Sequence, residues 1–247
     1  MSVYLKIISV FSAIIVLMNF LAGCNKKPES TLLGSDEFEE KRLTMVEDQI
    51  VDRGITDEYV LEALKSVKRH MFVTSESIEQ AYNDHPLPIG FGQTISQPYI
   101  VALMTEAVGV RPGDNVLEIG TGSGYQAAVL AEITEDVYTI EILEELVDFA
   151  SDNLSAAGYE NVEIQHGDGY YGWEQHAPYD IIIVTCAANH IPAPLISQLK
   201  DGGRLVIPLG DPTYYQTLTL ITKSGEDVIV DHLISVAFVP MTGEALK

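Results

Sequence analysis

The segment Glu118-Ile119-Gly120-Thr121-Gly122-Ser123-Gly124 combines a carboxylate with three closely spaced glycines. It follows an apolar run that predicts a strand and precedes a run that predicts a helix. Glycine lets the backbone approach a ligand closely and adopt positive φ. Ligands of open α/β sheets bind at the carboxyl ends of strands. The candidate cofactor residues are therefore Glu118, Gly120, Thr121, Gly122, Ser123 and Gly124.

Two kinds of cofactor compete for such a turn. A dinucleotide fingerprint requires Gly-x-Gly-x-x-Gly, and Tyr125 stands where its third glycine belongs. Glu118 would repel a pyrophosphate, but it would attract the ammonium and sulfonium groups of S-adenosylmethionine. The pattern favours S-adenosylmethionine. A dinucleotide enzyme and a structural turn without ligand remain the alternatives.

Two further acidic residues follow predicted strands. Glu141 ends the second strand, where a carboxylate can accept hydrogen bonds from ribose hydroxyls. Gly167-Asp168 follows the third strand, where Asp168 can face an adenine amino group. A solvated carboxylate and a plain Gly-Asp-Gly turn are the competing interpretations.

After Asp114, short apolar runs alternate with stretches of helical pattern. This alternation predicts an α/β fold with a parallel sheet covered on both faces, which would position the candidate residues. The predicted strands are 115–119, 137–141, 162–165, 181–185 and 204–208, followed by two more near 216–221 and 232–239. The predicted helices between them are 125–133, 143–157 and 193–199.

A helical extension precedes this core. Asp36 is expected to cap a first helix with Leu43, Val46 and Ile50 on one face, ending at Arg53-Gly54. Thr56 is expected to cap a second helix with Val60, Leu64 and Val67 inward. Residues 70–98 are expected to form a long functional loop. Pro98 then suits the first turn of a helix to Val108.

The first residues resemble a bacterial lipoprotein export signal. Lys6 precedes an apolar run, and Leu21-Ala22-Gly23-Cys24 is similar to a lipobox. We therefore expect a signal peptide at 1–23, a polar tether at 24–35, helices and an active-site loop at 36–110, and the core at 111–247, with 36–247 as one compact domain. This organisation predicts a lipid-anchored envelope protein. An uncleaved membrane anchor and a cytosolic protein with a misassigned start are the alternatives.

Bulk properties exclude several functions. The 247-residue chain has a formal net charge of -22, which disfavours nucleic-acid binding. His166, His176 and His190 are too scattered for a metal site, so we expect no metal. Cys24 and Cys186 are not expected to pair, because Cys186 reads as a small buried residue near a strand end.

Several segments together resemble the protein-L-isoaspartate O-methyltransferase family. The most specific is Gly90-Phe91-Gly92-Gln93-Thr94-Ile95-Ser96-Gln97-Pro98. The resemblance covers about residues 43–241, with further matches at 116–125, 167–169, 177–185, 198–208 and 238–241. It implies a Rossmann-like, seven-stranded S-adenosylmethionine-dependent methyltransferase fold. It also implies methylation of the side-chain carboxylate of L-isoaspartyl residues in damaged proteins and peptides, which starts their repair.

The resemblance assigns roles residue by residue. Ser96 matches the active-site serine of the family, and Thr94 and Ile95 match its loop over substrate and cofactor. The glycine loop, Glu118, Glu141 and Asp168 match its cofactor residues. Ser96 would orient the substrate rather than act as a nucleophile, since the substrate carboxylate is already ionised. Capping of the following helix is a second role open to Ser96.

The sequence also departs from the family pattern. Lys68 replaces a frequent proline, Ala237 a frequent arginine and Asn189 a frequent proline, which bears on substrate range. The export signal departs from the usual cytoplasmic location of the family. A methyltransferase with another substrate and a non-catalytic envelope lipoprotein that kept the fold are the alternative functions.

Overall fold

The computed structural model describes residues 37–211 and 214–246. Residues 38–247 fall into one compact unit. The expected signal peptide, tether and Asp36 cap lie outside the described residues.

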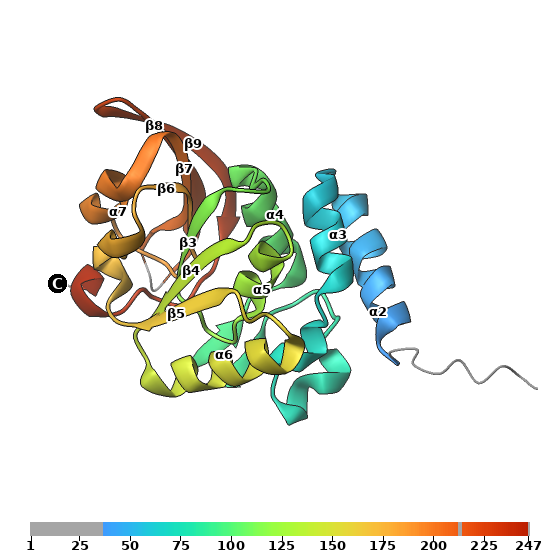
Figure 1. The fold of residues 1–247 in the computed structure, drawn as a ribbon. Helices are drawn as coiled ribbons and strands as arrows, with labels where there is room; N and C mark the ends of the chain where they lie inside the picture. The colour runs from blue at the N-terminus through green and yellow to red at the C-terminus, as the bar shows by residue number, and fades with distance from the viewer. Residues whose placement is uncertain (1–36, 212–213, 247) are drawn as a thin grey trace, which may run out of the picture. The chain divides into compact units, whose positions relative to one another are not determined.

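A seven-stranded sheet forms the centre of the unit (Figure 1). Its order is β5-β4-β3-β6-β7-β8-β9; the first five strands are parallel, and β8 and β9 each run antiparallel to their predecessor. The strands are β3 (Asn115–Ile119), β4 (Asp136–Glu141), β5 (Val162–His166), β6 (Tyr179–Val184), β7 (Leu199–Gly210), β8 (Gln216–Ser224) and β9 (Asp227–Val236). The α/β fold is confirmed, and the parallel part of the sheet carries the glycine loop after β3 and Glu141 at the end of β4.

Alternation along the strands sends side chains into two separate cores. Val116, Ile181 and Ile183 belong to one core, with residues of the helices that precede or follow β3 and β4. Leu117 and Ile182 belong to the other. The helices are α2 (Glu39–Thr44), α3 (Glu58–Ser66), α4 (Pro98–Val108), α5 (Tyr125–Ala131), α6 (Glu144–Ala157) and α7 (Ala193–Gln198).

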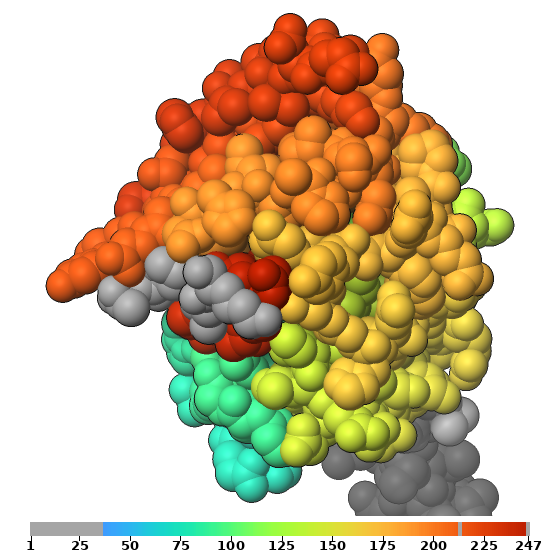
Figure 2. Space-filling model, turned by 90° about the vertical axis from the view of Figure 1, so that its left-hand side faces the viewer, coloured from blue at the N-terminus to red at the C-terminus, as the bar shows by residue number. Residues whose placement is uncertain are grey.

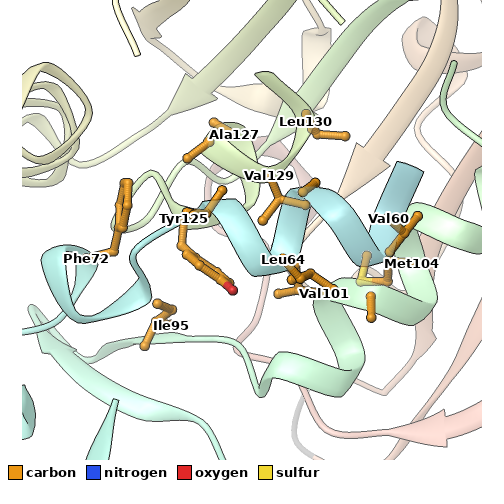
Figure 3. Packing of buried hydrophobic residues seen from close by; sticks show 14 of the residues in the cluster. Val60, Leu64, Phe72, Ile95, Val101, Met104, Tyr125, Ala127, Val129 and Leu130 are labelled. Carbon is orange, nitrogen blue, oxygen red and sulfur yellow. The ribbon is translucent and has the colours of Figure 1, made fainter. Parts of the chain in front are cut away.

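The first core joins the helical extension to the sheet. Figure 3 shows Leu64 of α3, Val101 and Met104 of α4, and Val129 of α5 packed together. All four side chains are at most 2% exposed. Their packing fixes α3, α4 and α5 against one another. The second core lies under α7 and the C-terminal segment, which contribute Leu195, Met241 and Ala245.

The N-terminal helices differ from the prediction in two places. A π-helix at Met45–Ile50 continues α2. Its wider turns shift the helical face, so the prediction for Leu43 was wrong: this side chain is 44% exposed, whereas Val46 and Ile50 are buried. The cap of α3 is Asp57, not Thr56, because the Asp57 carboxylate accepts the amide hydrogens of Tyr59 and Val60.

Residues 70–98 are more regular than the predicted loop. They contain a 3-10 helix at Ser75–Gln80 and an antiparallel hairpin of β1 (Leu87–Gly90) and β2 (Gln93–Ile95). Helix α4 then begins at Pro98 and ends at Val108 as predicted. The hairpin brings the motif Gly90–Ser96 to the edge of the sheet's ligand-binding end.

Candidate active site

A cavity of about 330 Å³ opens where β3, β4 and β6 end. The hairpin forms one side of it, and the C-terminal segment Val239–Thr242 forms another. Figure 2 shows the face on which the C-terminal segment (dark red) lies close to the green residues of the hairpin region. The volume falls within the range of small-molecule sites.

The glycine loop shapes the floor of this cavity. Gly120, Gly122 and Gly124 all have positive φ, at 98°, 56° and 87°. A Cβ on Gly120 would lie 2.5 Å from the Thr185 hydroxyl oxygen, which donates a hydrogen bond to the Gly120 carbonyl. Glycine is therefore required at position 120 by both conformation and close approach.

Strand alternation places three polar side chains on the same face of the sheet. Glu118 is paired with Thr139 in the β3–β4 register, and Glu141 lies two residues beyond Thr139. The Thr139 hydroxyl donates to Glu118 Oε2 at 2.7 Å, and the Thr121 and Thr139 hydroxyl oxygens are also 2.7 Å apart. Both carboxylates line the cavity.

Glu118 is fully enclosed and only partly satisfied. Its Oε1 atom has no hydrogen-bond partner among the described residues. Burial, with a smaller contribution from the charge of Glu141, raises the pKa of Glu118 to about 8, although the bond from Thr139 opposes the rise. A buried carboxyl group in this state is suited to a cation that would enter the cavity.

Glu141 has a different environment. Its Oε2 accepts the Gly122 amide hydrogen at 2.9 Å, and its Oε1 accepts those of Ile142 and Leu143 at 2.9 and 3.1 Å. These bonds fix the carboxylate beside the glycine loop. Each carboxylate oxygen has more than one lone pair, so Glu141 can still accept from a ligand hydroxyl.

The hairpin supplies the predicted substrate residues. Thr94, Ile95 and Ser96 all line the cavity. Ile95 is 4% exposed and also packs in the first core, close to Tyr125 in Figure 3. Phe91, which was not predicted as a site residue, lies at the hairpin tip with φ 53°, is 58% exposed and lines the same cavity.

The structure does not give Ser96 a capping role. Gln97 is the N-cap residue of α4, and no side chain caps this helix. Within the described part of the chain, the Ser96 hydroxyl makes no hydrogen bond. It therefore remains available to a ligand in the cavity.

Gly167 and Asp168 lie next to the cavity but do not line it, whereas Gly169 does. The Asp168 carboxylate accepts the amide hydrogens of Tyr170 at 3.0 Å and Glu244 at 2.8 Å. It thus caps a short 3-10 helix and holds the C-terminal segment.

The C-terminal wall of the cavity was not predicted from the sequence. Phe238–Met241 was part of the family resemblance, but only the fold brings Val239–Thr242 against the glycine loop. Cys186 also lines the cavity; it is half-buried rather than buried as predicted, because it faces this space. Burial and the nearby carboxylates raise the pKa of its thiol, which therefore stays protonated.

Other features concern metals and membranes. Among residues 37–211 and 214–246, no group of three or more His, Cys, Asp or Glu side chains could hold a metal ion. No helix in the same part of the chain is long and apolar enough to cross a membrane.

The three departures from the family pattern lie away from the cavity. Lys68, Asn189 and Ala237 are all exposed and lie outside the cavity lining.

The mixed seven-stranded sheet, the glycine loop after β3 and the carboxylate that ends β4 together define an S-adenosylmethionine-dependent methyltransferase fold. Comparison with known proteins narrows this class. Residues 40–246 match the family model described as protein-L-isoaspartate(D-aspartate) O-methyltransferase. The chain belongs to this family.

Individual relatives agree with this assignment. A protein-L-isoaspartate O-methyltransferase 2 of Shewanella sediminis is 53% identical over 213 residues, which cover 86% of this chain and 87% of the relative. One from Polaromonas is 55% identical and covers 76% of this chain and 90% of the relative. A solved structure of a Plasmodium falciparum protein-L-isoaspartate O-methyltransferase in complex with S-adenosyl-L-homocysteine has a TM-score of 0.72 and 28% identity, covering 81% of this chain and 98% of that one.

Proposed function

We propose that this enzyme transfers a methyl group from S-adenosylmethionine to the side-chain carboxylate of L-isoaspartyl residues in damaged proteins and peptides. One observation carries the proposal beyond family membership. A single cavity joins the glycine loop and its two carboxylates to the hairpin residues Thr94 and Ser96. A donor and an acceptor of the methyl group can therefore meet in one space.

The residues of the cavity fit the cofactor. Glu118 offers an unpartnered, buried carboxyl oxygen to the ammonium group. Glu141 is held by three amide hydrogens in a position to accept from ribose hydroxyls. Gly122 has a positive φ and carries no side chain, so the space beside them stays open. When bound, S-adenosylmethionine supplies an electrophilic methyl group on a sulfonium.

The chain's own part in the reaction is alignment and exclusion of water. The substrate carboxylate is ionised near neutral pH, so no general base is required. One of its oxygens forms the new bond to the methyl carbon, the carbon–sulfur bond breaks, and the electron pair stays on sulfur. Ser96 is assigned as a hydroxyl donor that orients the substrate, with Thr94 and Ile95 beside it. An enclosed site favours the step, because water solvates the opposite charges that combine.

A substrate panel tests this function. The purified domain is incubated with labelled S-adenosylmethionine and, separately, an isoaspartyl peptide, free small-molecule carboxylates and undamaged protein. We expect label in the isoaspartyl peptide alone. Preferred labelling of a small molecule would support the methyltransferase with another substrate, and S-adenosylmethionine binding without any transfer would support the non-catalytic alternative.

Ser96→Ala tests the assigned serine. We expect a lower rate of methylation with cofactor affinity nearly unchanged, because the hydroxyl faces the substrate side and makes no bond that holds the fold. Rates from methyl transfer and affinities from calorimetry separate the two effects. An unchanged rate would contradict the assignment.

We also infer a lipid-anchored location in the cell envelope. The support is the order of Lys6, the apolar run, Leu21-Ala22-Gly23-Cys24 and a polar tether, together with a family match that begins only at residue 40. Multiple acyl chains on Cys24 would hold the domain at the bilayer, where isoaspartyl envelope proteins are within reach.

Fractionation of a bacterial host expressing the full chain and Cys24→Ser tests this location. We expect the wild type in the membrane fraction with its N-terminus cleaved before Cys24 and acylated, whereas Cys24→Ser should keep an uncleaved N-terminus without acyl chains. A wild-type protein that stays in the cytosol with an intact N-terminus would restore the usual cytoplasmic location of the family.

A further inference from the structure

Arg69 is an arginine enclosed completely by protein, with 0% exposure. It belongs to the short 3-10 helix Arg69–Phe72 between α3 and the hairpin. Among the described residues it forms no ion pair, and its Nη1 group has no hydrogen-bond partner. The cavity lining does not include it, so the proposed function leaves this residue unexplained.

The guanidinium instead contacts two backbone carbonyl groups and one aromatic ring. Its Nε donates to the Ala81 carbonyl at 2.8 Å, and its Nη2 donates to the Ser96 carbonyl at 2.7 Å. Its Cζ atom lies over the Tyr125 ring, 4.6 Å from the centroid. Ser96 ends the substrate hairpin, and Tyr125 directly follows the glycine loop, so Arg69 links the two sides of the active site from behind.

Stability alone does not account for this arrangement. Burial lowers the pKa of Arg69, because a charge that lacks a carboxylate partner is poorly solvated there. Burial also raises the pKa of Tyr125 to about 12, so its hydroxyl stays neutral and gives no counter-charge. An apolar side chain of similar size would fill the space without the desolvation cost. What the guanidinium adds is fixed geometry, because its planar fork can bond two carbonyls and stack on a ring at once.

We propose that Arg69 is a positioning residue that fixes Ser96 relative to the glycine loop. It acts through the Ser96 carbonyl on one side and the Tyr125 ring on the other. The inference rests on the proposed function, since Ser96 matters only if it orients the substrate. It explains why an uncompensated charge lies at this point of the core.

A double-mutant cycle between Arg69→Lys and Ser96→Ala tests the link. Lysine keeps the charge but cannot bond both carbonyls and stack on the ring. We expect Arg69→Lys to lower kcat by about 10- to 100-fold, the cost of a misplacement near 1 Å, with KM for S-adenosylmethionine changed less than about threefold. In the Ser96→Ala background the same substitution should lower kcat by less than about threefold. An equal loss in both backgrounds would overturn the proposal, because a general loss of stability does not depend on the Ser96 hydroxyl.

Hydrogen exchange gives a readout that does not depend on the substrate. We expect faster exchange of the amides at 93–97 in Arg69→Lys. The matched control is Arg42→Lys, a second buried arginine whose Nε donates to the Lys65 carbonyl, and exchange at 93–97 should not change there. Unchanged exchange in Arg69→Lys would overturn the anchoring role. A wild type that ignores isoaspartyl peptides would instead count against the proposed function, and the exchange result would still decide the role of Arg69.

Discussion

At the scale of single residues, the side chains of Glu118 and Glu141 lie on one face of β3 and β4 but differ in hydrogen bonding. Glu141 accepts three amide hydrogens, whereas Glu118 is enclosed and has a pKa of about 8. The difference arises from local partners, not from residue type. A bound ammonium group would favour the ionised form of Glu118, so cofactor binding is coupled to loss of a proton.

Proton release on binding tests this coupling. At pH 7 the raised pKa keeps Glu118 protonated in the ligand-free protein, so we expect release of nearly one proton per cofactor bound. Affinity should then rise with pH toward 8, where Glu118 ionises by itself. Calorimetry in two buffers of different ionisation enthalpy measures the release. Glu118→Gln is the control, since the amino group of the ligand titrates at about 7.7–8.0 in both proteins. Equal release from both proteins would contradict the account.

The same pKa makes a stability prediction with a defined sign. Because the folded pKa lies above the ordinary value of 4.5, the folded state binds more protons between these values. The contribution of Glu118 to stability therefore falls as pH rises from about 4.5 to about 8. Unfolding midpoints in urea across this range should show a smaller decline in Glu118→Gln than in the wild type. A parallel decline in both would be evidence against a buried, protonated Glu118.

Gly122 offers a test of the glycine loop. Its φ of 56° is unfavourable for a β-branched residue. A Cβ there would meet only Ile89 Cδ1, at 3.6 Å, so no clash within the protein excludes a side chain. A side chain is unfavourable because of the positive φ and because it would occupy the cavity. We expect Gly122→Val to abolish cofactor binding in calorimetry. Gly113→Val is the matched control, with φ 88° and open space around it, and a similar loss of binding there would point to a general folding defect.

At the scale of elements, the sequence predicted those parts that local pattern determines. The bounds of β3 and α4 were predicted correctly, because an apolar run and a proline mark them. The hairpin was not predicted. The start of β7 at Leu199 was also not predicted, because the run Lys200-Asp201-Gly202-Gly203 is typical of a turn. Strand β7 reaches this far because Leu199 pairs with Tyr179 across the sheet. Long-range pairing of this kind leaves no local signal.

Some residues of the active site could also be predicted from local pattern, whereas others could not. The glycine loop and Glu141 are predictable because they occur at fixed places along a strand–turn–helix pattern. The bond from the Glu244 amide to Asp168 spans 76 residues of sequence, and Phe238–Met241 contains no residue type that suggests a cavity wall. These features required the fold.

The C-terminal segment provides a prediction at this scale. A Cβ on Gly243 would lie 2.4 Å from the Asp168 carboxylate, so Gly243→Ala should displace the segment that holds the wall Val239–Thr242. We expect cofactor affinity to fall by roughly tenfold, comparable to the loss of one hydrogen bond to a charged group. Gly225→Ala is the control, because it has a similar positive φ but nothing nearby. Equal affinity of both variants for S-adenosylmethionine would show that the segment is not part of the site.

At the scale of the whole molecule, charge is the dominant property. The net charge of -22 would draw cationic peptides toward the enzyme and repel anionic ones. We expect kcat/KM for a lysine-rich isoaspartyl peptide to fall several-fold between low salt and 0.5 M salt, while that for a glutamate-rich peptide rises. Steady-state assays at graded ionic strength measure both. Salt responses of the same sign would contradict electrostatic steering.

Methylation of isoaspartyl residues is measured with twin peptides that differ only in an isoaspartyl or aspartyl linkage. Wild-type enzyme and Gly122→Val are compared in labelled S-adenosylmethionine, and base-labile methyl ester is counted in each peptide. We expect ester in the isoaspartyl peptide with wild-type enzyme and in neither peptide with the variant. Equal labelling of both twins by the wild type, or of neither, would contradict the proposed function.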